Sequence, residues 1–110
     1  MLSSLEYHVL LALAGGPMYG YAIKDAVALE SSGTLTPRPG SLYRVLARLM
    51  TAGLVQAGEP TGGVPPHPGH ARKYYALTPA ARPALLAESR RLREAAAMAE
   101  KRLGVAGGPS

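Results

Sequence analysis

One stretch of the chain, residues 36–55, restricts the folds open to this sequence more than any other. Proline suits the first turn of a helix and resists its interior, so Pro37 and Pro39 predict a helix that begins near Pro39. Gly53 is predicted to end that helix, and a strand is expected from Leu54. Apolar residues at helical spacing predict its buried stripe: Leu42, Val45, Leu46, Leu49 and Met50.

Another face of this predicted helix is cationic. Ser41, Arg44 and Arg48 follow one another at helical intervals, so two guanidinium groups project side by side. A short helix with one buried and one cationic side is typical of the element that a protein inserts into the DNA major groove. The pattern alone also fits an ordinary solvated face, so the neighbouring segments must decide between the two interpretations.

The flanking segments carry clear helix and strand signals. Ser3 and Glu6 have the spacing of a capping box, which predicts a first helix that ends before Gly15. The strands are separated by a Pro/Gly-rich loop longer than an ordinary hairpin connection. The remaining predicted elements are a helix over residues 19–30, the helix over 39–52, strands over 54–58 and 72–77, and a long helix that ends near residue 103.

The start of the long last helix can be placed in two ways. Thr78 and Pro79 have the pattern of an N-cap followed by a first-turn proline. Pro83 would clash inside a helix that begins so early, so the sequence predicts either a kink there or a true start near Arg82.

The last helix also has the period of a coiled-coil seam, which predicts a two-fold dimer with a second copy of the chain. A small domain with a core that lacks Phe and Trp gains from such burial. The predicted interface residues, two of them in the first helix, are Leu5, Val9, Leu85, Ser89, Leu92, Ala96, Ala99 and Leu103.

Three helices followed by a two-stranded wing constitute a winged helix-turn-helix, so the predicted fold is mainly α. The predicted division is a winged-helix domain over residues 1–77, a dimerisation helix over 78–103 and a disordered tail over 104–110. The absence of cysteine excludes disulfides and thiol catalysis. No secretory signal and no membrane-spanning stretch is evident, so a soluble cytoplasmic protein is expected.

The charge of the chain is +5, and the basic excess is concentrated around the predicted cationic helix and the wing. Residues 37–76 contain five basic side chains and one acidic side chain, a distribution expected for a surface that meets nucleic acid. His67 and His70 lie in a loop that offers little preorganisation for a metal, and His8 is interpreted as structural. No constellation of catalytic residues is visible, so neither an enzyme, a metal site nor a cofactor is predicted.

Four segments, taken in order, resemble the PadR family of bacterial transcriptional regulators. They are Tyr19-Gly20-Tyr21-Ala22-Ile23, Pro39-Gly40-Ser41-Leu42-Tyr43, Gly53-Leu54-Val55 and Arg72-Lys73-Tyr74-Tyr75-Ala76-Leu77-Thr78. No one segment is diagnostic, but the ordered set covers nearly the whole chain. The short C-terminal region resembles the compact branch of the family, which ends in one long dimerisation helix.

The resemblance implies a dimeric winged-helix repressor that binds a roughly palindromic DNA operator. In such proteins the third helix enters the major groove, and the wing touches the neighbouring backbone. Combined with the cationic face, the family pattern predicts that the DNA-contacting residues are Tyr19, Tyr21, Arg38, Ser41, Tyr43, Arg44, Arg48, Arg72 and Lys73.

The sequence departs from the family pattern at several positions. Arg44 replaces a usual proline and adds a cation, while Arg38 replaces a small hydroxyl residue, so that a helix cap is lost and a phosphate contact can be gained. Ala81 and Pro83 depart from the usual start of the last helix. Without Trp, a multidrug-sensing role is disfavoured, and any small-molecule effector stays unidentified. The alternative is a winged-helix module that binds another protein and no DNA.

Overall fold

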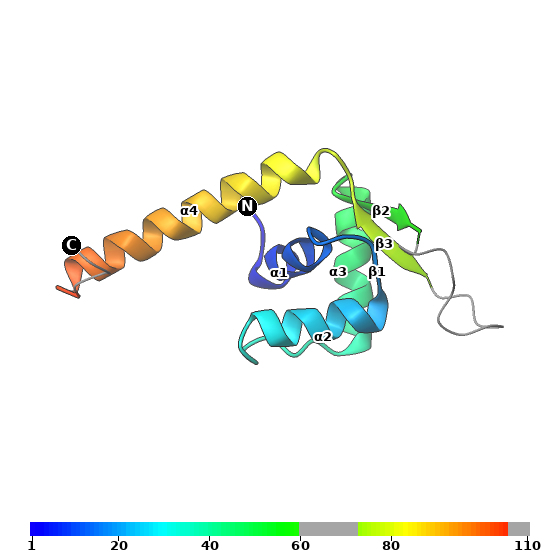
Figure 1. Ribbon diagram of the computed structural model, residues 1–110, viewed down its shortest axis with the longest axis horizontal. Helices are drawn as coiled ribbons and strands as arrows, with labels where there is room; N and C mark the ends of the chain where they lie inside the picture. The colour runs from blue at the N-terminus through cyan, green and yellow to red at the C-terminus, as the bar shows by residue number, and fades with distance from the viewer. Residues whose placement is uncertain (60–72, 106–110) are drawn as a thin grey trace.

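The computed structural model describes residues 1–59 and 73–105 (Figure 1). Most residues of the hydrophobic core belong to helices. The predicted succession of three helices, wing and long helix is confirmed, and one further strand joins the wing. In chain order the elements are α1 (Ser4–Leu13), β1 (Met18–Tyr19), α2 (Gly20–Glu30), α3 (Pro39–Thr51), β2 (Val55–Gly58), β3 (Tyr74–Leu77) and α4 (Ala81–Arg102).

Helix α1 lies in the middle of the fold and packs against α2, α3, α4 and β3 (Figure 1). Its N-terminus has the predicted capping box, in which the Ser3 hydroxyl accepts from the Glu6 amide and the Glu6 carboxylate accepts from the Ser3 amide. Apolar side chains from every α-helix and from β2 and β3 meet around it. The core is formed by Val9, Leu10, Leu13, Ile23, Val27, Leu42, Val45, Leu46, Leu49, Val55, Tyr75 and Ala81.

Helix α3 ends where the sequence predicts. Gly53 has a φ of 76°, a conformation that glycine adopts at low cost, and it follows the C-cap residue Ala52. The Leu54 amide donates to the Leu49 carbonyl at 2.9 Å and the Gly53 amide to the Met50 carbonyl at 3.0 Å. This is a Schellman motif, which turns the chain directly from α3 into the wing.

The wing is a three-stranded antiparallel sheet, not the two-stranded hairpin that the sequence predicts. Strand β3 lies in the centre, with Met18 opposite Tyr75 on one side and Ala57 opposite Tyr75 on the other. Strand β1 has only two residues, too few for an alternating pattern to be visible in the sequence. A side chain at Gly58 would come within 3.0 Å of the Ala76 Cβ, so glycine permits close approach of β2 to β3.

Helix α4 begins at Ala81, which confirms the expected start near Arg82 and makes the alternative N-cap at Thr78 wrong. Thr78 donates its hydroxyl proton to the Gly53 carbonyl instead, and so fastens the wing to the end of α3. Pro83 lies in the first turn, where a backbone N–H has no partner within the helix, so proline is accommodated there.

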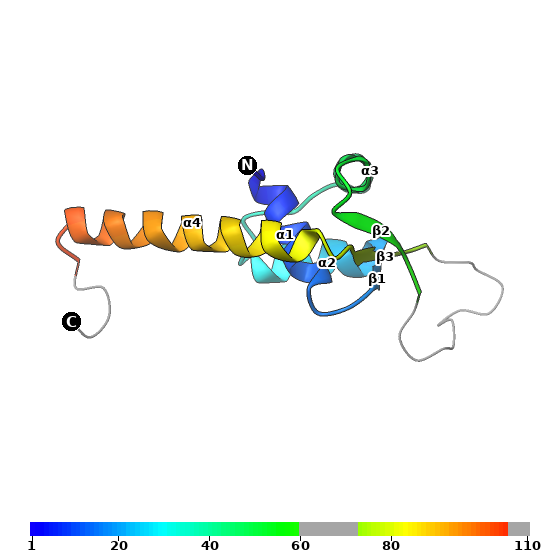
Figure 2. The same ribbon diagram turned by 90° about the horizontal axis from the view of Figure 1, so that it is seen from above.

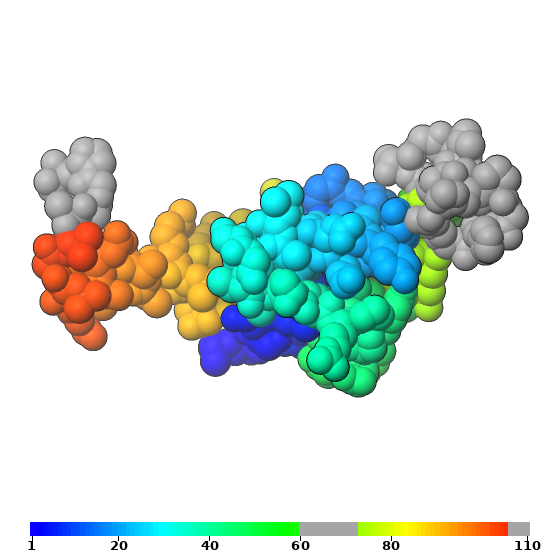
Figure 3. Space-filling view, turned by 90° about the horizontal axis from the view of Figure 1, so that it is seen from below, coloured from blue at the N-terminus to red at the C-terminus, as the bar shows by residue number. Residues whose placement is uncertain are grey.

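The molecule consists of a head, residues 1–59 and 73–89, and an arm, residues 90–105. Figure 2 shows α4 running from the head outward, with α3 seen end-on at one edge of the head. In the space-filling view the arm projects beyond α1 and α2 (Figure 3). Every residue of the arm is exposed, whereas the first turns of α4 pack against α1.

Candidate nucleic-acid interface

The outer face of α3 is the most cationic helical surface of the head. Leu42, Val45, Leu46 and Leu49 are buried as predicted, whereas Met50 is 37% exposed and lies at the edge of the buried stripe. The exposed residues on the solvent side include Arg38, Tyr43, Arg44, Ala47 and Arg48. The predicted division of this helix into a buried side and a cationic side is therefore confirmed.

Ser41 and Arg44 lie together on this outer face. The Arg44 guanidinium donates to the Ser41 hydroxyl at 3.3 Å, a contact expected between residues three positions apart on a helix. Arg38 is the N-cap residue and provides no side-chain cap, as its substitution for a hydroxyl residue predicts. The exposed Arg38 and Arg44 and the half-buried Ser41 thus bring two guanidinium groups and one hydroxyl to the start of α3.

Arg48 has an acidic partner that sequence reasoning missed. Its Nε lies 3.7 Å from Oε2 of Glu6 on α1, and the Arg48 side chain remains 58% exposed. The pKa of Glu6 is lowered, chiefly by the hydrogen bond from the Ser3 backbone amide, with smaller contributions from the Ser3 hydroxyl and Arg48. Glu6 is therefore a carboxylate at neutral pH. Because 42 positions separate the two residues, no local pattern could reveal the pair.

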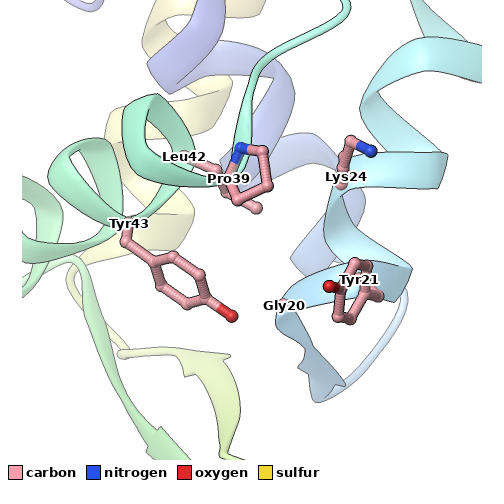
Figure 4. Close-up of a pocket in the computed structure, with 6 residues that line it drawn as sticks. All are labelled: Gly20, Tyr21, Lys24, Pro39, Leu42 and Tyr43. Atoms are coloured by element: carbon pink, nitrogen blue, oxygen red, sulfur yellow. The ribbon is translucent and has the colours of Figure 1, made fainter.

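A small niche separates the start of α2 from the start of α3 (Figure 4). Tyr43 extends from α3 toward Gly20, and Tyr21 and Lys24 lie on the α2 side. A Cβ at Gly20 would come within 2.6 Å of the Tyr43 hydroxyl oxygen, so glycine leaves the room that this hydroxyl occupies. Tyr43 is 47% and Tyr21 63% exposed, which leaves both available to a partner.

Lys24 is a residue of this niche that the sequence reasoning did not select. It lies one helical turn after Tyr21, so the spacing along α2 could have placed both on one face. Tyr19, in contrast, belongs to β1, where its ring packs edge-to-face on Tyr74 with centroids 5.8 Å apart. The structure thus brings Lys24, Tyr21 and Tyr43 together and gives Tyr19 a contact inside the sheet.

Of the two predicted wing cations, Lys73 lies within the described residues and Arg72 outside them. The Lys73 Nζ is 5.5 Å from the centroid of the Tyr75 ring, a cation–π arrangement. Tyr75 is buried, as expected for a core residue, and burial raises the pKa of its hydroxyl. His67 and His70 also lie outside the described residues, as does the predicted disordered tail beyond Val105.

The residues predicted for the dimer interface divide into two groups. Val9 is completely buried in the head, so the prediction that it contacts a partner chain is wrong. Leu5 and Leu85 pack partly against the core of their own chain, and the Ser89 hydroxyl is 2.8 Å from that of Tyr7. The exposed group, which lies on the arm, consists of Leu92, Ala96, Ala99 and Leu103.

An ion pair marks the boundary between head and arm. The Arg91 Nε donates to a Glu88 carboxylate oxygen at 3.0 Å, and a second guanidinium nitrogen contacts the other oxygen. The hydrogen bonds from Arg91 lower the pKa of Glu88, whose side chain is buried.

In the described part of the chain, no three His, Asp or Glu side chains converge to hold a metal. Of the helices described, none combines the length and apolar character that a membrane span requires.

Residues 9–87 match the model of the transcriptional regulator PadR-like family. An uncharacterized 37.1 kDa protein of transposon Tn4556 from Streptomyces fradiae is 43% identical over 81 residues; these are 74% of this chain, which spans only 21% of that relative. A PadR family transcription regulator from Clostridium difficile has the same fold, with 21% identity, a TM-score of 0.73 and coverage of 92% of this chain and 99% of that one.

A second solved structure, Bacillus subtilis PadR in complex with operator DNA, has a TM-score of 0.60 and 23% identity. That likeness covers 76% of this chain and 45% of the other. At these identities the two solved structures show a shared fold. The match of the family model over most of the chain is evidence for the family itself and not only for the fold.

Proposed function

This chain belongs to the PadR-like family of transcriptional regulators, and from that premise we propose that it is a homodimeric repressor that binds a pseudo-palindromic DNA operator. The observation that carries the proposal is the outer face of α3, where Arg38, Ser41 and Arg44 are accessible while the opposite face is buried in the core. A rigidly seated helix with exposed guanidinium groups suits the major groove, where arginine reads guanine through paired donors.

Contacts with the DNA backbone are assigned to the niche and the wing. Lys24, Tyr21 and Tyr43 gather next to the start of α3 and offer one ammonium and two hydroxyl groups to phosphate oxygens. Lys73 adds a cation beside strand β3, and the family pattern assigns a DNA contact to Arg72 as well. Phosphate contacts of this kind provide affinity that falls steeply with salt, and they carry no sequence information themselves.

The arm supplies the dimer in this proposal. Leu92, Ala96, Ala99 and Leu103 are exposed and follow the spacing of a coiled-coil seam, so a second copy of α4 can cover them. To read two half-sites one turn of DNA apart, the α3 helices of such a dimer would lie about 34–36 Å from one another. An effector that changes the angle between the two heads would then release the operator.

The proposed regulator acts in the cytoplasm, where it meets chromosomal DNA. The proposal assigns no catalytic step and no cofactor to any residue. It assigns DNA reading to residues 1–77 and assembly to the exposed part of residues 78–103.

Binding of the full chain to a random-sequence DNA duplex, measured over a range of salt concentrations, tests the proposal. We expect affinity at low salt that falls steeply as salt rises. Arg44→Ala combined with Arg48→Ala should weaken binding about tenfold or more and flatten the salt dependence, with an unchanged helical circular-dichroism signal.

Lys101→Ala combined with Arg102→Ala is the matched control, because it removes the same charge from the far end of the arm. This variant should retain most of the affinity. Absence of binding by the unmodified chain at low salt would favour the protein-interaction module. Equal affinity of the Arg44/Arg48 variant and the parent would show that α3 is not the reading helix.

A further inference from the structure

The carboxylate of Glu6 is shared between a helix cap and a DNA-facing arginine. Its Oε1 accepts from the Ser3 amide at 2.7 Å, and its Oε2 lies 3.7 Å from the Arg48 Nε. The Ser3 hydroxyl in turn accepts from the Glu6 amide at 3.1 Å. Two hydrogen bonds of the capping box therefore set the orientation of Glu6 independently of Arg48, and α1, in the centre of the head, holds it in place.

The contact through Nε leaves the ends of the Arg48 side chain available. A guanidinium group has five N–H donors, and the four on its terminal nitrogens include the pair that reads guanine. Arg48 is more than half exposed and lies one turn after Arg44 on the outer face of α3. Within residues 1–59 and 73–105, Glu6 is the ionic partner of Arg48, so that one restraint acts on a side chain with many rotamers.

Holding α1 against α3 is not a sufficient reason for this pair. Ion pairs in which one partner is largely exposed contribute little to stability, and both helices already meet through the buried core. A carboxylate at the edge of a surface that meets DNA, however, repels phosphates. Such a repulsive element weakens nonspecific binding, where phosphate contacts dominate, more than it weakens a contact with a base.

We propose that Glu6 is a positioning residue for DNA recognition: it directs Arg48 toward a base edge and away from phosphates, and so raises the discrimination between operator and nonspecific DNA. This inference rests on the proposed function. It adds a residue of α1, outside the reading helix, that sets how selectively the reading helix binds.

The test uses Glu6→Gln in the full-length chain, because glutamine keeps the capping box while it removes the charge. Two duplexes of equal length serve as probes: one selected by the parent protein from genomic DNA, and a scrambled version of it. We expect the variant to bind the scrambled duplex more tightly than the parent does. Its ratio of specific to nonspecific affinity should fall about tenfold, within the range that one bidentate base contact provides.

Two variants of Arg48 distinguish positioning from helix packing. In an Arg48→Ala background, Glu6→Gln should change the affinity ratio much less than it does in the parent, because the residue that Glu6 directs is gone and only the repulsion between the carboxylate and phosphates is lost. Arg48→Lys keeps a cation beside Glu6 but lacks the planar fork, so it should also lose discrimination. Ser3→Ala is the control for the cap: it removes the hydroxyl but keeps the carboxylate, and its affinity ratio should stay within about twofold of the parent.

A Glu6→Gln protein with the parental affinity ratio would overturn the inference, as would an equal effect of Glu6→Gln with and without Arg48. Both results leave the proposed function intact, since the protein still binds DNA. Failure of the parent chain to bind either duplex would instead overturn the proposed function.

Discussion

The head and the arm of this molecule differ in how far they bury their apolar side chains. In the head, apolar residues from four helices and two strands bury one another. Partly buried polar groups such as the hydroxyls of Tyr7 and Ser89 are hydrogen-bonded to each other. The arm continues the same helix α4, yet Leu92, Met98 and Leu103 are 40%, 47% and 78% exposed. A helix of such composition is stable in water when something covers its apolar side, so the comparison assigns folding to the head and assembly to the arm.

The change from packed to exposed side chains takes place within one turn of α4. Ser89 still bonds to Tyr7 of α1, and Glu88 is buried with Arg91 folded over it. Beyond Arg91 every described residue of α4 is exposed. The angle at which the arm leaves the head is therefore set by α1, the same helix whose N-terminus holds the Glu6–Arg48 pair.

The largest effect on stability is expected in the core of the head. Leu46→Ala should destabilise the protein by about 2–5 kcal/mol, because Leu46 is 1% exposed and the cavity would open among packed side chains. Urea denaturation followed by circular dichroism measures this loss. Met50→Ala, on the same helix but at the edge of the stripe, is the control and should cost far less. Equal losses for the two variants would contradict the assignment of the core.

An intermediate effect is expected in the arm, where a substitution should change assembly and leave the head folded. Leu92→Glu removes a side chain whose full burial is worth at most about 1.5–3 kcal/mol, of which the proposed dimer supplies a part, and adds a charge to the proposed seam. Sedimentation equilibrium should show a dimer for the parent chain and a monomer for the variant. Ala97→Glu, off the seam on the same helix, should remain dimeric. A monomeric parent chain would end the proposal that the arm assembles the protein.

The smallest effect is expected at the junction of the two regions. The Ser89 hydroxyl donates to the Leu85 carbonyl at 2.8 Å, so the Tyr7 hydroxyl is the donor in the Tyr7–Ser89 bond. Tyr7→Phe should therefore cost about 0.5–1.5 kcal/mol of stability, measured by thermal unfolding. Tyr21→Phe removes a hydroxyl from a largely exposed ring and should change stability little. Equal unfolding temperatures for Tyr7→Phe and the parent would show that this bond does not fasten α4 to α1.

Much of the fold could be predicted because its signals are local. Ser3 and Glu6 mark the start of α1 and Gly53 marks the end of α3, since caps depend on residues within a few positions of one another. The two faces of α3 follow from periodicity alone. Strand β1 could not be predicted, because two residues form it only through pairing with β3, more than fifty positions later.

The candidate interface divides in the same way. The exposed cations of α3 could be selected from spacing, whereas Lys24 enters because α2 and α3 converge around the niche. Val9 fits the apolar pattern of an interface as well as that of a core, and only the packing of α1 decides that it is core.

By itself, then, the sequence determined which segments become helices, where α1 and α3 begin and end, and which side of α3 is cationic, because these properties depend on neighbours along the chain. The tertiary structure alone decided that Glu6 pairs with Arg48, that Glu88 is buried and that the apolar side of the arm is exposed in the described part of the chain. These properties depend on distances between residues far apart in sequence, and such distances exist only once the head has folded.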